Sequence, residues 1–129
     1  MIRADRRSVL KSSFALAALS VMPGALQARE TAPALMVYDA RFAVSRELAA
    51  HWLARGVPVL DPRDHDLGIA WRDYIPGLLA KGGGIEGTTL WSDQFICEAH
   101  GSDHGLRLLR SGNAVPEAAA GALRTWRLL

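Results

Sequence analysis

Apolar and polar residues alternate along the chain in blocks with two different periods. Residues 34–38 form a continuous apolar run, which is typical of a strand buried on both faces of a parallel sheet. Residues 45–56 carry apolar side chains at helical spacing, with Ser45 as the expected N-cap and Gly56 as the C-terminal stop. A second short apolar run at 57–61 predicts another strand. This part of the chain therefore predicts a β-α-β unit.

Weaker strand and helix patterns follow in the second half of the chain. Pro76 is expected to end the helix before it, Gly87 to weaken a strand, and Gly101 to end a helix near residue 100. The last strand is expected at an edge of the sheet, antiparallel to its neighbour. The predicted elements are a helix at 64–74, a strand at 85–88, a helix capped by Thr89 or Ser92, a strand at 106–110 and a strand at 123–128.

Strands that alternate with helices predict an α/β fold. For a chain of 129 residues we expect a small three-layer sandwich, with a mostly parallel sheet of about four to five strands. The pattern resembles a truncated Rossmann-like or flavodoxin-like unit, and the likeness is one of pattern only. The main alternative is an all-helical fold, because alanine and leucine dominate the chain. Val37 and Ile96 are expected to be fully buried, with Leu48 and Leu53 close behind.

The first 28 residues have a different character from the rest. Four basic residues precede a moderately apolar, alanine-rich stretch at 14–22, and small residues follow up to Ala28. This layout is that of an export signal, and its apolar part is too short for a membrane anchor. The sequence therefore predicts a signal peptide at 1–28 and a single domain at 29–129. No cysteine follows the signal to carry a lipid, so we expect no stable membrane anchor after cleavage.

The basic part of this signal has a more specific pattern. Residues 5–11, Asp-Arg-Arg-Ser-Val-Leu-Lys, resemble the twin-arginine (Tat) motif, from which they depart at Asp5 and Val9. The resemblance implies that the Tat translocase recognises Arg6 and Arg7, and that the chain folds in the cytoplasm before export to the periplasm. For a chain without a cofactor, such a signal is explained either by fast folding or by a partner protein that is exported together with the chain. An ordinary Sec signal is the alternative.

The charge of the chain depends on whether this segment is counted. It holds four of the 15 basic residues and one of the 13 acidic ones, so residues 29–129 carry 11 basic and 12 acidic residues. The pI of about 9.1 therefore belongs to the signal. The remaining arginines are scattered among acids and form no basic stripe. We expect no nucleic-acid partner, because such binding depends on clustered positive charge.

Polar residues follow the predicted strands where each strand ends. In open α/β sheets these ends meet at one edge, where ligands bind. The sequence therefore predicts a site for a small polar ligand, and the alternative is that these residues only form turns. The site comprises Asp39, Arg41, Asp61, Thr88 and Thr89, with Arg63, Asp64, His65 and Asp93 nearby.

The sequence lacks the glycine motifs that bind the phosphates of common cofactors. The turn at 39–43 has no dinucleotide fingerprint, and the triple glycine at 82–84 has no Lys-Ser or Lys-Thr after it. We therefore predict no cofactor.

Cys97, His100 and His104 form a second constellation with chemistry. On an unbroken helix these three positions would share a face, and a thiolate with two imidazoles is a good zinc or copper set. Because Gly101 is expected to break the helix, Cys97 is more naturally a buried core residue. The chain has no nucleophile elbow and no recognisable catalytic cysteine context.

These observations favour an exported, non-catalytic accessory or binding protein of the periplasm, acting with a protein partner or a small polar ligand. The alternative is a small periplasmic enzyme that uses the strand ends, or a metal-handling protein that uses Cys97, His100 and His104.

Overall fold

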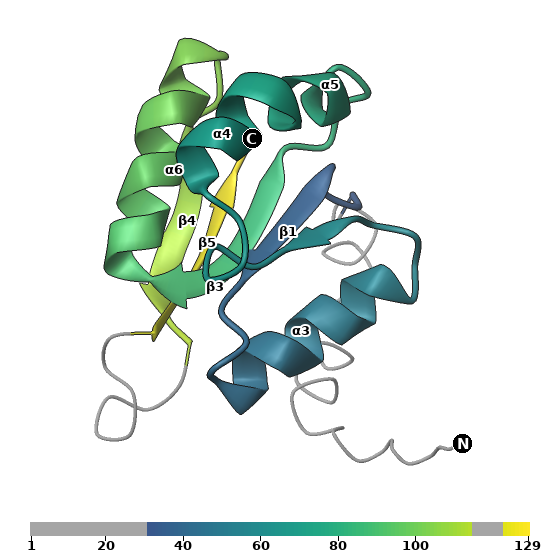
Figure 1. The fold of residues 1–129 in the computed structure, drawn as a ribbon, viewed down its shortest axis with the longest axis vertical. Helices are drawn as coiled ribbons and strands as arrows, with labels where there is room; N and C mark the ends of the chain where they lie inside the picture. Colours follow the sequence, from purple (N-terminus) through teal and green to yellow (C-terminus); the bar gives the residue numbers. More distant parts are fainter. Residues whose placement is uncertain (1–30, 115–122) are drawn as a thin grey trace. The chain divides into compact units, whose positions relative to one another are not determined.

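A computed structural model describes residues 31–114 and 123–129 (Figure 1). Within it, Ala32–Leu129 form one compact unit. The predicted signal peptide at 1–28 lies outside the described residues. In the part of the chain that the structure describes, no helix combines the length and the apolar composition needed to cross a membrane.

Helices and strands alternate along the chain, so the predicted α/β fold is confirmed in general terms. The five strands in the described residues form one sheet in the order β2-β1-β3-β5-β4. The elements are β1 (Leu35–Tyr38), α3 (Ala43–Leu53), β2 (Val59–Leu60), α4 (Leu67–Asp73), α5 (Ile75–Leu79), β3 (Ile85–Leu90), α6 (Trp91–Asp103), β4 (Leu108–Asn113) and β5 (Leu123–Leu128).

The sheet is mixed, which corrects the expectation of a mostly parallel one. β1 pairs in parallel with β2 and β3, whereas β5 pairs antiparallel with both β3 and β4. Helical crossovers join the three parallel strands, while no helix that the structure describes separates β4 from β5. The connection between them, residues 114–122, is shorter than the roughly dozen residues that a parallel crossover needs, so the two strands pair antiparallel. Because β5 pairs with β3 on one side and β4 on the other, it is an interior strand, whereas the sequence predicts an edge strand.

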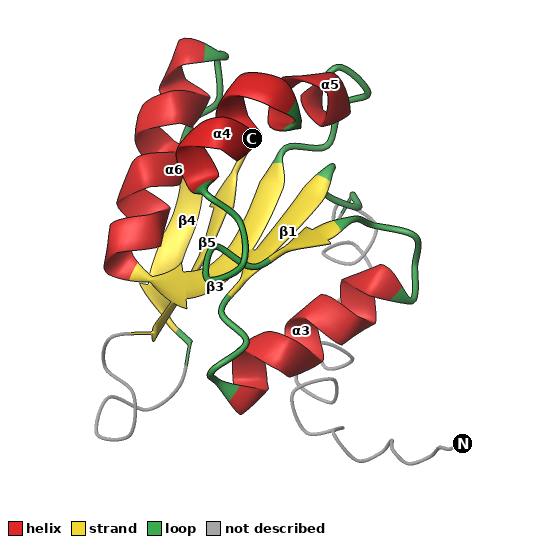
Figure 2. Ribbon diagram, viewed as in Figure 1, coloured by secondary structure: helices red, strands yellow, loops and turns green. Residues whose placement is uncertain are grey.

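Helices cover the sheet on both faces (Figure 2). Leu35 and Val37 of β1 face a core that α4, α5 and α6 complete. Met36 faces a smaller core against α3, because successive side chains of a strand point to opposite faces. The continuous apolar run in β1 is thus buried from two sides, as its composition predicts.

The predicted helix at 64–74 corresponds to α4 at Leu67–Asp73, and a separate short helix, α5, follows it at Ile75–Leu79. Asp66 is the N-cap of α4, and its side chain accepts the N–H of Ile69 at 2.9 Å. α4 ends at Asp73, before Pro76, as the sequence predicts, and Pro76 itself lies in the first turn of α5. A proline there sacrifices no hydrogen bond, because the first N–H groups of a helix have no partner within the helix.

Gly101 does not end α6, which continues to Asp103 with His104 as its C-cap. A Cβ at Gly101 would lie 3.2 Å from Leu128, so the missing side chain lets the helix lie close to β5. The face of α6 toward the core consists of Gln94, Cys97 and Gly101.

The predicted burial of individual residues is right for β1 and wrong for two helix positions. Val37 is fully buried, whereas Ile96 is 36% exposed and Leu53 is 58% exposed. Ile96 points outward because its neighbour Cys97 occupies the inward face of α6.

Candidate functional site

The strand ends of β1, β2 and β3 bring together five charged residues, which we call the strand-end cluster: Asp39, Arg41, Asp61, Arg63 and Asp93. From β1 the chain continues into α3 on one face of the sheet, and from β3 it continues into α6 on the other face. This is the place where ligands bind in open α/β sheets, outside the carboxyl ends of the strands.

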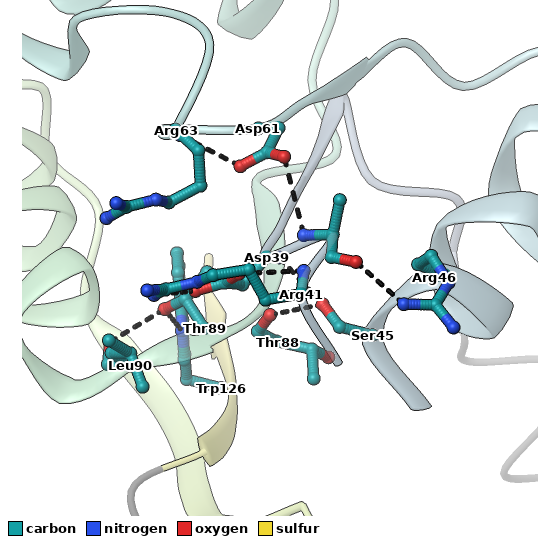
Figure 3. Close-up of polar contacts among 11 residues, drawn as sticks. Asp39, Arg41, Ser45, Arg46, Asp61, Arg63, Thr88, Thr89, Leu90 and Trp126 are labelled. Atoms are coloured by element: carbon teal, nitrogen blue, oxygen red, sulfur yellow. Dashed lines mark hydrogen bonds and ion pairs between the residues drawn. The ribbon is translucent and has the colours of Figure 1, made fainter. Parts of the chain in front are cut away.

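Asp39 is fully buried and is held by Arg41 (Figure 3). Its Oδ1 accepts the backbone N–H and the Nε–H of Arg41 at 3.0 and 2.9 Å, and its Oδ2 accepts Nη2–H at 2.6 Å. These hydrogen bonds outweigh the effect of burial and hold the pKa of Asp39 below its ordinary value of 3.8. Asp39 is therefore an ionised group at neutral pH.

Ser45 ties the ends of two strands to α3. Its hydroxyl accepts the N–H of Asp39 at 2.7 Å and donates to the carbonyl oxygen of Thr88 at 2.6 Å. It is not the N-cap that the sequence predicts, because α3 begins two residues earlier, after Phe42. The sequence carries no local signal for a contact that spans 43 residues.

Asp61 joins the loops that follow β1 and β2. Its carboxylate accepts the N–H of Arg63 at 2.8 Å and the N–H of Ala40 at 3.4 Å. Both oxygens are therefore used inside the protein, and the residue is buried. Asp61 positions the two loops, and it leaves the guanidinium of Arg63 outside.

Arg63 is exposed, and its guanidinium has no hydrogen bond or ion pair with any described residue. Its side chain extends toward the same side of the cluster as that of Arg41 (Figure 3). Two guanidinium groups from two different loops thus face one region.

Asp93 stands in the first turn of α6 and is partly buried. Burial raises its pKa, and the nearby charge of Asp39 raises it further, while Arg63 and Arg41 lower it. Arg63 is therefore close enough to influence Asp93, although no hydrogen bond joins the two among the interactions of the described residues. The Arg63 guanidinium and the Asp93 carboxylate thus lie at the same end of the sheet, and neither has a hydrogen bond or ion pair within the described structure.

Thr88 and Thr89, which the sequence places in the ligand site, are both fully buried in β3. The Thr89 hydroxyl donates to the carbonyl of Leu90 at 2.9 Å and accepts the indole N–H of Trp126 at 3.0 Å. The Thr88 carbonyl accepts from Ser45, and the Thr88 hydroxyl has no partner in the described structure. These threonines therefore support the strand end and present no exposed hydroxyl.

The predicted metal set is not assembled. Cys97 lies in the main core, and burial raises the pKa of its thiol to about 12. The ring centroids of His100 and His104 each lie 5.5 Å from the ring centroid of Trp71. Among residues 31–114 and 123–129, no group of three histidine, cysteine or acidic side chains is placed to hold a metal ion.

No family model matches the chain, and no match was found to a curated protein or to a solved structure.

Proposed function

We propose that the chain is an exported binding protein of the periplasm, without catalysis of its own, that holds a small zwitterionic ligand at the strand-end cluster. The observation that carries this proposal is the pair Arg63 and Asp93. Their side chains carry opposite charges at one end of the sheet, and neither the Arg63 guanidinium nor the Asp93 carboxylate has a hydrogen bond with any described residue. A ligand with a carboxylate for Arg63 and an ammonium group for Asp93 would satisfy both.

The rest of the cluster favours binding over chemistry. The carboxylates of Asp39 and Asp61 are buried and already accept hydrogen bonds from the protein. They fix the two loops that carry Arg41 and Arg63, so the Arg41 guanidinium and the backbone at Arg63 are held in place before a ligand arrives. Preorganised loops suit recognition of a small polar molecule.

Titration of the full chain with glycine, followed by backbone NMR, tests this proposal. Glycine should shift amides at 39–42, 61–64 and 91–94 with an affinity in the millimolar range, as expected for so small a ligand. Acetate and methylammonium, which each carry one half of the charge pattern, should bind more weakly.

Two variants show whether the cluster is responsible. Arg63→Gln should abolish the glycine shifts. Arg72→Gln is the matched control, because Arg72 is also exposed and is paired with Asp73 at 2.7 Å, outside the cluster. Equal shifts in wild type and in Arg63→Gln, or no shifts in the wild type, would refute the proposed site.

A small periplasmic enzyme is the second candidate, and the raised pKa of Asp93 favours it. A carboxyl group with a raised pKa beside other charged groups is typical of proton-transfer sites. The two functions differ in the fate of the ligand: a bound zwitterion keeps its own NMR signals over hours, whereas a substrate is converted.

Export is the second part of the proposal and rests on the twin arginines. Replacing Arg6 and Arg7 with lysine should leave the chain in the cytoplasm, unprocessed and about 28 residues longer than the exported form. Arg3→Lys, which changes a basic residue outside the motif, is the control and should be exported normally. Export of the double variant, or export in cells without the Tat channel, would refute the Tat assignment.

A protein partner exported with the chain would need an interaction surface, and α6 offers one. Trp91 and Phe95 are 57% and 55% exposed, and their rings stack at 5.2 Å. Aromatic residues are enriched at protein interfaces. Native mass spectrometry of the exported protein should show a complex that Trp91→Ser with Phe95→Ser removes. Leu53→Ser, which changes an equally exposed apolar residue on α3, should leave it intact.

A further inference from the structure

A pocket of about 510 Å³ lies between the edge strand β2 and the helix α4. Val59 and Leu60 line it from the strand, and Ile69, Ala70 and Tyr74 line it from the helix. Ile69 and Tyr74 are 53% and 45% exposed, which is unusual for large apolar side chains beside a core. The volume is within the range of small-molecule sites, and such sites are mostly lined by apolar groups.

The polar part of the lining is acidic. Asp64, Asp66 and Asp73 surround the apolar surface together with His65, and the lining contains no lysine or arginine. Asp73 is neutralised by Arg72, with which it forms an ion pair at 2.7 Å.

Two carboxylates remain to face a ligand. One oxygen of Asp66 accepts the N–H of Ile69 as the helix cap, and the other accepts no hydrogen bond from any described residue. The carboxylate of Asp64 has no hydrogen bond or ion pair with any described residue. The pocket therefore combines an apolar interior with two carboxylates at its rim, of which Asp66 also interacts with the charge of Arg72 and Asp64 has no ion pair with any described residue.

We propose that this pocket binds a small organic cation, with its apolar body against Ile69 and Tyr74 and its ammonium group at Asp64 and Asp66. Charge complementarity selects the cation over a neutral or anionic molecule of the same shape. None of the lining residues belongs to the strand-end cluster, so this site is independent of the function proposed above.

Three probes of one shape test the proposal: benzylamine, benzyl alcohol and benzoate. Each is titrated into the full chain, and the backbone amides of residues 59–74 report binding. Benzylamine should bind roughly fivefold more tightly than benzyl alcohol, the effect of one or two solvent-screened charge contacts. Benzoate should be the weakest, and added salt should reduce the preference for benzylamine.

Variants separate the two contributions. Asp64→Asn with Asp66→Asn should equalise benzylamine and benzyl alcohol, and asparagine still caps α4 so the helix is kept. Ile69→Lys places a cation on the exposed rim and should abolish benzylamine binding. Asp103→Asn, an exposed acid at the end of α6, is the matched control and should change nothing.

The proposal is overturned if benzylamine causes no shifts at residues 59–74, or if benzyl alcohol binds as tightly as benzylamine in the wild type. It is also overturned if the double asparagine variant keeps the full preference for the cation. Loss of glycine binding in Arg63→Gln has no bearing on these outcomes, because Arg63 does not line the pocket.

Discussion

The indole ring of Trp126 lies over Gly87, at the place where any other residue would carry its Cβ atom. The two residues are direct partners in the antiparallel pairing of β5 with β3. The same indole donates its N–H to Thr89 at 3.0 Å, and Trp126 is fully buried. The low strand propensity of glycine suggests that Gly87 would interrupt β3, but in the structure it makes room for one of the tryptophans of the main core.

Gly87→Ala should destabilise the protein by roughly 1–3 kcal/mol or more, because the added methyl group must displace the indole ring. Gly112→Ala is the matched control in β4, on the other side of β5, where a Cβ would meet nothing within 4 Å. Denaturant unfolding measures both, and the control should stay within about 0.5 kcal/mol of wild type.

A double-mutant cycle identifies the cause of that loss. In a Trp126→Leu background the cost of Gly87→Ala should shrink, since the smaller side chain leaves room for the methyl group. An unchanged cost would mean that the strand needs Gly87 for its backbone and not for the space.

Ionisation of Asp39 should make the free energy of unfolding depend on pH. Because its pKa in the folded protein is lowered below the ordinary 3.8, its contribution is complete above that value and is lost as the pH falls from about 4 through the folded pKa. Asp39→Asn should cost about 1–3 kcal/mol at pH 7, the effect of charged hydrogen bonds. The difference from wild type, measured by urea unfolding, should narrow below pH 4. A constant difference from pH 2 to pH 7 would contradict the assigned pairing with Arg41.

Asp93 should affect the pH dependence of the free energy of unfolding in the opposite direction. Its folded pKa is raised above 3.8, so the folded state favours the protonated form and loses stability as the pH rises from about 4 through the folded pKa. Asp93→Asn removes this penalty, and its stability relative to wild type should therefore increase between pH 3 and pH 7. The same unfolding series measures it. A relative stability that falls over this range would show that Asp93 is paired with a cation in the folded protein.

The carboxylates of the candidate site were predictable because their signal is local. β1 is apolar on both faces, and Asp39 follows it directly, while Asp61 follows β2. Parallel strands bring such ends to one edge, so two short patterns were enough to place both residues. Asp93 could be placed near them because it begins the helix that follows β3.

The roles of Ser45, Thr89 and the glycines could not be predicted, because tertiary contacts decide them. A serine near a helix start is an ordinary N-cap candidate, and only its contact with Thr88 shows otherwise. Gly101 has low helix propensity, yet packing against Leu128 keeps it inside α6. The interior position of β5 depends on pairing with β3, whose partner residues lie more than 30 positions away in the sequence.

Labelling of the Cys97 thiol distinguishes a core role of this residue from a role as a metal ligand. Its side chain is fully buried in the main core, and burial raises the pKa of its thiol to about 12, so it carries almost no thiolate at pH 8. Iodoacetamide should therefore fail to label it in native buffer, with or without a chelator, and should label it on unfolding. Cys97→Ala should cost about 1 kcal/mol, the effect of a small truncation in the core. Labelling that appears only when the chelator is added would mean that metal protects the thiol, and the set with His100 and His104 would then replace the core role.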